Sequence, residues 1–215
     1  MSSLESIPWC ATLLQKPGVV KFTPQARQPA GPDGRFPSQD QLFKTSLKTP
    51  NTVPEYIGFY LSPFSDLTQM TLPPTPLVGG GPRLLINTMS LLVDLRPGVN
   101  GFNGTAHGGL IASLLDEAMG CLFFCNAMVL HEMMAKGAEI PEHILNMAEA
   151  GPTFTASMNV KFMKPISTPQ VVIASATFTK AEGRKLFLAY DIKDNRGTEY
   201  AKGEGIWISP RKGKL

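Results

Sequence analysis

The sequence predicts an α+β domain in which an antiparallel sheet wraps one long buried helix. Residues 110–124 carry apolar side chains at helical spacing, a strand-like segment precedes them at 83–95, and four strand-like segments follow between 153 and 209. A helix that is apolar on nearly every side must be covered by other elements, and the strands are available to cover it. This order of elements favours one sheet around one helix.

The predicted helix shows two adjacent apolar stripes. Both follow the spacing that places side chains on one side of a helix. The stripes consist of Leu110, Leu114, Ala118 and Leu122, and of Ile111, Leu115 and Met119. Because they leave little polar surface, we expect this helix to be buried.

The strands after the helix are predicted by alternation and by turn residues. Apolar and polar residues alternate over 153–162, which is typical of a strand with one apolar and one polar face. Three further strands are expected at 171–180, 185–193 and 200–209, separated by the turn sequences Ala-Glu-Gly-Arg and Asp-Asn-Arg-Gly. Short turns between consecutive strands predict a meander.

The compact domain is expected to span residues 83–215. Residues 1–82 are rich in Pro, Gly, Ser and Thr and are predicted to form a partly irregular extension that wraps this domain. An insertion is expected at about 126–151, with a short helix at 142–150 after a proline. It is either a surface insertion or a lid over an apolar ligand. The lid would use three methionines, Met133, Met134 and Met147.

The composition is that of a globular protein and argues against several classes. The net charge is +3 and the basic residues are scattered, without the aromatic-interleaved basic stretch that indicates nucleic-acid binding. Three cysteines, an odd number, favour a reducing compartment. The N-terminus does not read as a secretory signal, and no apolar run is predicted to reach membrane-spanning length. We expect a cytoplasmic protein, with a mitochondrial location as the alternative.

The chemistry is predicted at the start of the helix, where Gly104-Thr-Ala-His-Gly-Gly precedes the apolar stripes. The N–H groups of a first helical turn have no partner within the helix, and Gly108 and Gly109 have no Cβ to shield them. Such groups can polarise the carbonyl oxygen of an acyl group and stabilise an oxyanion. The alternative is that the glycines only allow a tight entry into the helix.

Asp116 adds weight to acyl-group chemistry, because a carboxylate on a buried apolar helix is costly unless it is paired or used. Its side of the helix is otherwise made of small residues, so something approaches the helix closely there. That group is either a ligand, with Asp116 as general base or nucleophile, or a neighbouring element, with Asp116 bound by a backbone donor. The small residues are Gly109, Ala112, Ser113 and Gly120.

The spacing of Gly108 and Asp116 predicts a homodimer. The two residues are roughly 12 Å apart along a helix, whereas an oxyanion donor and an attacking group lie about 3 Å from the same reacting atom. One helix cannot supply both groups to one carbonyl. We therefore expect a two-fold symmetric dimer that joins Gly108 of one subunit to Asp116 of the other.

His107 is included among the candidate catalytic residues, although we expect it to orient the loop at the helix start. No histidine or cysteine lies at ligand spacing from it, so no metal site is predicted. The sequence also lacks a Gly-x-Ser-x-Gly elbow, which argues against a Ser-His-Asp hydrolase.

Over about residues 84–209 the chain resembles the hotdog-fold acyl-CoA thioesterases of the PaaI-like branch. The resemblance is carried by the motif around His107, by Leu-Leu-Asp-Glu-Ala-Met-Gly at 114–120, and by segments 155–165 and 182–187. It implies a hotdog fold and hydrolysis of an acyl-CoA to a free acid and CoA, without a cofactor. It also implies that Gly108 binds the thioester oxygen, that Asp116 attacks or activates water, and that Thr155 positions this water.

Further substrate contacts are expected near these motifs. Many relatives carry an asparagine where this chain has Gly101, so that role is not assigned to one residue here. The candidate substrate-binding residues are Gly109, Asn103, Ser157 and Asn159, and for the CoA phosphates Lys161, Lys164, Arg184 and Lys185.

Two other functions stay open at this point. One is a hotdog hydratase or dehydratase that pairs His107 with Asp116 across the dimer. The other is a non-catalytic acyl-CoA-binding protein whose N-terminal extension binds a partner. The dimer can also form a tetramer, as a dimer of dimers. The apolar helix and the methionines favour a medium or long fatty acyl chain, and hence a role in lipid metabolism.

Overall fold

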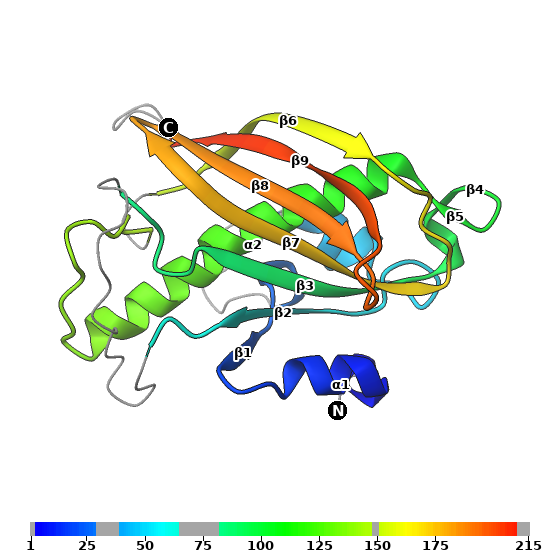
Figure 1. Ribbon diagram of the computed structural model, residues 1–215, viewed down its shortest axis with the longest axis horizontal. Helices are drawn as coiled ribbons and strands as arrows, with labels where there is room; N and C mark the ends of the chain where they lie inside the picture. Colours follow the sequence, from blue (N-terminus) through cyan, green and yellow to red (C-terminus); the bar gives the residue numbers. More distant parts are fainter. Residues whose placement is uncertain (1–2, 29–38, 65–81, 148–150, 210–215) are drawn as a thin grey trace.

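The computed structural model describes residues 3–28, 39–64, 82–147 and 151–209. One antiparallel sheet curves around a single long helix, α2 (Gly108–Ala135), as Figure 1 shows. The order of its seven strands is β1-β2-β3-β7-β8-β9-β6. The predicted α+β architecture, the hotdog arrangement of a sheet around a helix, is therefore confirmed. The strands are β1 Val19–Phe22, β2 Tyr56–Leu61, β3 Thr88–Leu95, β6 Phe154–Phe162, β7 Gln170–Glu182, β8 Lys185–Lys193 and β9 Glu199–Ile208.

Shorter elements complete the described chain. A helix, α1 (Pro8–Leu14), lies near the N-terminus, and the short strands β4 (Asn100–Phe102) and β5 (Thr105–Ala106) pair with each other just before α2. Single helical turns lie at Leu4–Ser6, Gln25–Arg27, Leu42–Ser46 and Pro97–Val99.

The helix α2 extends beyond the predicted end at Phe124 and reaches Ala135. It continues because Val129, Leu130 and Met133 carry on the buried stripe. The first part of the expected insertion is thus helix. By length and composition α2 is able to cross a membrane, which corrects the expectation that no apolar run is long enough. In the protein its apolar side chains pack in the core inside the curved sheet.

The prediction of a short helix at 142–150 is wrong for residues 142–147, which form turns and irregular backbone. Residues 148–150 lie outside the described residues. The backbone of this segment pairs with Arg83 and otherwise makes, within the described chain, only turn bonds, from the Ile144 N–H to the Pro141 carbonyl and from the Met147 N–H to the Leu145 carbonyl, both at 2.9 Å. The Arg83 N–H donates to the His143 carbonyl at 2.9 Å, and the Leu145 N–H donates to the Arg83 carbonyl at 2.8 Å. This pairing holds the segment beside the residues that lead into β3.

The strand expected at 83–95 is shorter than predicted, because β3 begins at Thr88. Before that point the backbone is bound by a side chain of α2. Asn126, which is fully buried, accepts from the Ile86 N–H and donates to the Ile86 carbonyl, both at 2.9 Å. It also donates to the Leu122 carbonyl within the helix. The Ile86 backbone groups are therefore satisfied without a neighbouring strand.

The predicted meander is confirmed for β7, β8 and β9, which follow one another both in sequence and in the sheet. Its two turns contain Gly183 and Gly197, both with positive φ. The strand β6 pairs with β9 and has no neighbour on its other side among the strands of the described residues. It is thus an open edge of the sheet.

The described part of the predicted extension belongs to the same sheet. It supplies β1 and β2, which continue the sheet beyond β3. The helix α1 packs on the outer face of the sheet, where Leu4, Cys10 and Leu14 form a small cluster with Leu92. All three cysteines of the chain are buried and free.

Asn126 provides a test of this arrangement. We expect Asn126→Ala to lower the free energy of unfolding by about 2–4 kcal/mol, because the buried Ile86 N–H and carbonyl lose their partner. Urea unfolding should show a lower midpoint with an unchanged slope. The matched variant Asn195→Ala, at an exposed turn position, should leave the midpoint within experimental error. Equal midpoints for the two variants would contradict the structural role of Asn126.

Candidate functional site

The start of α2 separates the two glycines of the predicted site. His107 is the N-cap residue, and its Nδ1 accepts a hydrogen bond from the Gly109 N–H at 2.9 Å. The Gly109 N–H is thus already bound. The Gly108 N–H has no acceptor among the hydrogen bonds of the described residues, so it is the group that remains for a ligand oxygen. His107 has the orienting position expected for it.

The position where relatives carry an asparagine is closed to a side chain here. A Cβ at Gly101 would lie 2.6 Å from His107 Cδ2 and 2.9 Å from His107 Cα. Asn103 is exposed in the turn between β4 and β5. The nearby Asn100 accepts a hydrogen bond from the Thr168 hydroxyl. Among the hydrogen bonds of the described residues, none joins Asn100 or Asn103 to Asp116.

Asp116 and Thr155 form the central contact of the site. Thr155 on β6 donates from Oγ1 to Asp116 Oδ1 on α2 at 2.6 Å. Both residues line a recess of about 400 Å³. The small residues Ala112 and Ser113 form part of its floor. The structure therefore brings Thr155 and Asp116 of the same chain together, although they are far apart in the sequence.

A β-bulge in β6 decides which side chains reach this recess. Thr155 is paired with Trp207 of β9, whereas Ser157 is paired with the adjacent residue Ile206, so Ala156 is the extra residue. Trp207 packs against Phe123 of α2, which places Thr155 on the helix side of the sheet.

The bulge turns the next polar residues to the opposite side. The expectation that Thr155, Ser157 and Asn159 share one polar face is wrong, because beyond the bulge it is Met158 that faces α2 and lines the recess with Asp116. Asn159 and Lys161 instead line a shallow pocket on the outer face of the sheet.

The four basic residues considered for the CoA phosphates fall into two groups. Lys161 and Lys164 lie at the end of β6 near Gly108, since Phe162 is the nearest neighbour of a Cβ placed at Gly108. Arg184 and Lys185 lie at the turn between β7 and β8, close to the start of β6. Seven residues of β6 separate the two groups, roughly 23 Å in an extended strand. Within one subunit they do not form one cluster.

The structure adds a second acid that the sequence reasoning missed. Glu117 accepts a hydrogen bond from the Tyr56 hydroxyl at 2.7 Å, and Arg27 lies over the Tyr56 ring at 4.6 Å from its centre. Burial raises the pKa of Glu117 above its ordinary value. Its position on a buried apolar helix was the available signal, the same one that singled out Asp116. Its partners come from the N-terminal segment, which carries no motif.

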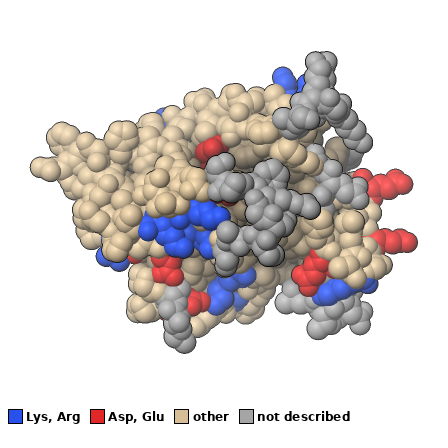
Figure 2. Space-filling model, turned by 180° about the vertical axis from the view of Figure 1, so that it is seen from behind, with Lys and Arg blue, Asp and Glu red and all other residues tan. Residues whose placement is uncertain are grey.

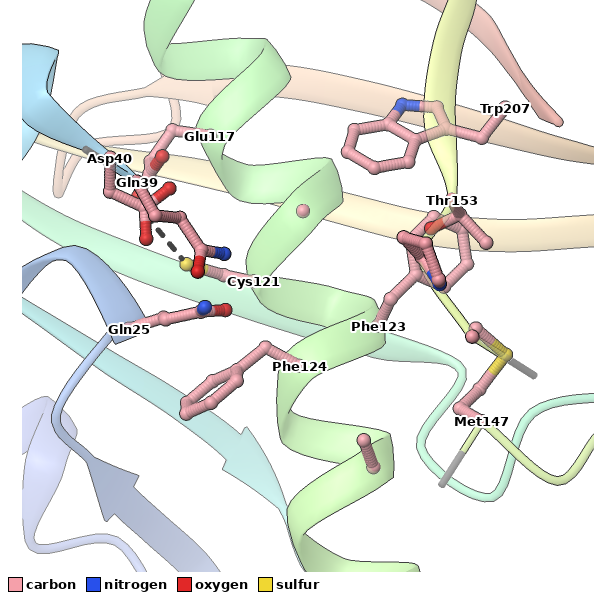
Figure 3. Close-up of a pocket in the computed structure, with 14 residues that line it drawn as sticks. Gln25, Gln39, Asp40, Glu117, Cys121, Phe123, Phe124, Met147, Thr153 and Trp207 are labelled. Atoms are coloured by element: carbon pink, nitrogen blue, oxygen red, sulfur yellow. Dashed lines mark hydrogen bonds between the residues drawn. The ribbon is translucent and has the colours of Figure 1, made fainter. Parts of the chain in front are cut away.

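A second cavity, of about 350 Å³, continues along α2 from this point. Figure 3 shows Glu117, Asp40, Gln39 and Gln25 on one side of the helix and Trp207, Thr153, Phe123 and Met147 on the other. Its floor contains the small residues Gly120 and Ala127. Asp40 and Glu117 also line the recess of Asp116, so the two spaces adjoin. The small side of α2 thus forms the floor of a continuous groove.

The methionines of the predicted lid do not act as one group. Met133 and Met147 are buried, and Met147 lines the cavity, whereas Met134 is exposed. Among the described residues, no group of three or more His, Cys, Asp or Glu side chains is arranged to hold a metal ion.

Comparison with known proteins identifies the family. The model of the thioesterase superfamily matches residues 103–201, which include the start of α2 and the strands β6 to β8. The chain is 30% identical over 185 residues to verlamelin biosynthesis protein B of Lecanicillium sp, covering 82% of this chain and 74% of that protein.

Other relatives are acyl-coenzyme A thioesterases THEM4. The bovine protein (Bos taurus) is 26% identical over 113 residues, covering 52% of this chain and 37% of the relative. The rat protein (Rattus norvegicus) is 25% identical over 161 residues, with coverages of 75% and 52%. The chain thus spans about half or less of these two relatives.

Among solved structures, the N33D mutant of phenylacetic acid degradation protein PaaI from Thermus thermophilus is 18% identical, with a TM-score of 0.44, and the match covers 60% of this chain and 90% of that one. The family model and the relatives support the predicted enzyme class, a thioester hydrolase, and the chain belongs to the thioesterase superfamily.

Proposed function

We propose that the protein is an acyl-CoA thioesterase that hydrolyses an acyl-CoA to a free carboxylic acid and CoA. The observation that carries this proposal is the Thr155–Asp116 hydrogen bond of 2.6 Å inside a recess that opens into a groove along α2. A carboxylate oriented by a hydroxyl can act on a thioester carbonyl held in that recess. The names of the THEM4 relatives support an acyl-CoA as the substrate.

The proposed reaction uses Asp116 as the group that activates or replaces water. As a general base, Asp116 takes a proton from a water molecule whose oxygen adds to the thioester carbon. The C–S bond then breaks, and the CoA sulfur leaves as a thiolate that takes up a proton. As a nucleophile, Asp116 itself forms an acyl bond that water later hydrolyses. In both cases Thr155 holds Oδ1, so the second carboxylate oxygen is directed at the substrate.

The oxyanion donor is proposed to be the Gly108 N–H of the partner subunit. In one chain Gly108 and Asp116 lie on the same helix, roughly 12 Å apart along its axis, too far to act on one carbonyl. Two copies related by a two-fold axis can bring Gly108 of one chain to Asp116 of the other. The dimer therefore holds two equivalent composite sites.

The edge strand β6 supports this association. The outer side of β6 is unpaired among the described strands, and Phe154 and Phe162 are 51% and 54% exposed along it. Open sheet edges with apolar side chains favour pairing with another chain. Phe162 also lies next to Gly108, so a partner that covers this edge reaches the oxyanion donor. The face seen in Figure 2 carries a patch of Lys and Arg side chains near its middle, with acidic side chains around it and toward one side.

The first prediction concerns the acid. We expect Asp116→Asn to lower kcat for decanoyl-CoA by about 10²–10⁴-fold, because the amide cannot accept a proton from water. Thr155→Ala should lower it by about 10-fold through loss of one hydrogen bond. Release of free thiol measures both rates. Thr179→Ala, at an exposed position of β7, is the control and should match the wild type. An unchanged rate in Asp116→Asn would refute the role of Asp116.

The second prediction concerns the helix start. Gly108 is the first residue of α2 and follows an extended His107, with φ −65° and ψ 133°, a setting that accepts proline. Gly108→Pro should lower kcat by about 10²–10³-fold, because it removes one oxyanion donor. Gly108→Ala keeps the N–H, and its Cβ would be 3.7 Å from Phe162, so it should remain close to wild type. Equal losses in both variants would point to a steric effect.

The third prediction tests the composite site. Gly108→Pro and Asp116→Asn are each expected to be inactive. When the two chains are unfolded together and refolded as a mixture, half of the dimers are mixed, and each mixed dimer has one intact site of two. The activity should therefore recover to about a quarter of the wild type. Absence of recovery in a mixture shown to contain mixed dimers would place both groups in one subunit.

A further inference from the structure

The hairpin of β4 and β5 carries an aromatic side chain that lies almost wholly in water. Phe102 is 81% exposed, more than any other large apolar residue of the described chain. Figure 1 shows the hairpin projecting beyond the start of α2. Burial of a phenylalanine side chain is among the larger single contributions to association, so this position favours a partner that covers it.

The hairpin holds Phe102 at a fixed place relative to the proposed oxyanion donor. The His107 N–H donates to the Val99 carbonyl at 2.9 Å, which closes the base of the hairpin. Gly101 lies directly on His107, since a Cβ at Gly101 would be 2.9 Å from His107 Cα. The Cα atoms of Phe102 and Gly108 are therefore at most about 12 Å apart. Any site that contains Gly108 thus has Phe102 beside it.

Other exposed apolar side chains lie at the two ends of the edge strand β6. At the end of the strand, Phe162 is exposed next to Gly108. At its start, Phe154 is exposed. Leu42 is also exposed and lines the recess of Asp116. Apolar surface is therefore available both beside the helix start and at the rim of the recess.

A two-fold dimer along β6 brings these two ends together. When a strand pairs antiparallel with its own copy, the start of each strand lies opposite the end of the other. The start of β6 carries Thr155, which binds Asp116, and its end lies beside Gly108. The hairpin of one subunit therefore arrives at the recess of the other, where Leu42 is exposed. The same pairing supplies the composite site proposed above.

We propose that Phe102 closes the recess of the partner subunit, where it packs against Leu42 of that subunit and against the substrate beside its thioester. The inference rests on the proposed thioesterase function and adds a substrate-contacting residue to its composite site. An aromatic ring over the recess excludes water from the reacting carbonyl, which strengthens the hydrogen bonds of Gly108 and Thr155.

Substitution of Phe102 tests its contribution to turnover. We expect Phe102→Ala to lower kcat/KM for decanoyl-CoA about 10-fold, because the substrate loses an apolar contact. Phe102→Tyr, which keeps the ring, should stay close to the wild type. Leu61→Ala, at an exposed position at the end of β2, is the matched control and should have no effect. The melting temperatures should not change, since both side chains are exposed. Wild-type kcat/KM in Phe102→Ala would overturn the inference.

Mixed dimers show in which site Phe102 acts. In the mixture of Gly108→Pro and Asp116→Asn chains, the intact site of a mixed dimer takes Gly108 from the Asp116→Asn chain. Phe102→Ala added to that chain should lower the recovered kcat/KM about 10-fold, whereas the same change in the Gly108→Pro chain should leave it unchanged. Equal effects in both chains overturn the assignment of Phe102 to the partner's recess. Absence of recovery in the parent mixture refutes the composite site and this inference with it, while recovery without any effect of Phe102→Ala refutes this inference alone.

A cross-link tests the contact without catalysis. The three native cysteines are buried, so cysteines introduced at the exposed positions of Phe102 and Leu42 are the ones that react. Phe102→Cys chains mixed with Leu42→Cys chains should form a covalent dimer with a short bis-maleimide. Each chain alone, and Leu61→Cys mixed with Leu42→Cys, should not. Absence of the covalent dimer overturns the inference, whereas a covalent dimer without thiol release from acyl-CoA retains the contact and refutes the thioesterase function.

Discussion

The whole structure depends on covering one helix that is apolar on nearly every side. The curved sheet covers one side of α2, and no single sheet can enclose the whole circumference of a helix. The remaining surface is covered by the N-terminal segment, where Phe22 packs against Phe124 and Phe43 against Tyr56. The expected extension is therefore part of the core. Where neither layer reaches, Gly120 and Ala127 form the floor of a groove.

Two neighbouring acids on this helix tie distant parts of the sheet to the same groove. Consecutive residues of a helix point in different directions, so Asp116 meets Thr155 of the edge strand β6, and Glu117 meets Tyr56 of β2 near the opposite edge. Both acids are half-buried, and each is thereby bound by a hydroxyl group, which reduces the cost of removing it from water.

Most of the fold and part of the site could be predicted from the sequence. The helix and the meander follow from local periodicity and turn residues, whereas the pairing of Thr155 with Asp116 is implied by the resemblance to the thioesterases. The late start of β3 does not follow from periodicity, because Asn126 replaces a neighbouring strand as the partner of Ile86. The alternating pattern also fails to predict that Ser157 and Asn159 face outward, since one extra residue in a bulge moves every later side chain to the opposite face of the strand. The position of Glu117 on the apolar helix could be read from the sequence, but its contacts with Tyr56 and Arg27 could not.

The bulge in β6 lies on the strand at which we propose that two chains associate. Without the extra residue Ala156, a strand that presents Thr155 to Asp116 would present Ser157 and Asn159 beside it, and a polar strand face would lie against α2. With the bulge, Met158 and Val160 pack inward below Thr155, so one hydroxyl enters an otherwise apolar contact. The same strand is the open edge of the sheet and ends beside Gly108. A subunit that pairs along this edge approaches both the hydroxyl-bound acid and the free helix N–H. The proposed role of a second subunit and the isolation of Thr155 therefore concern the same strand.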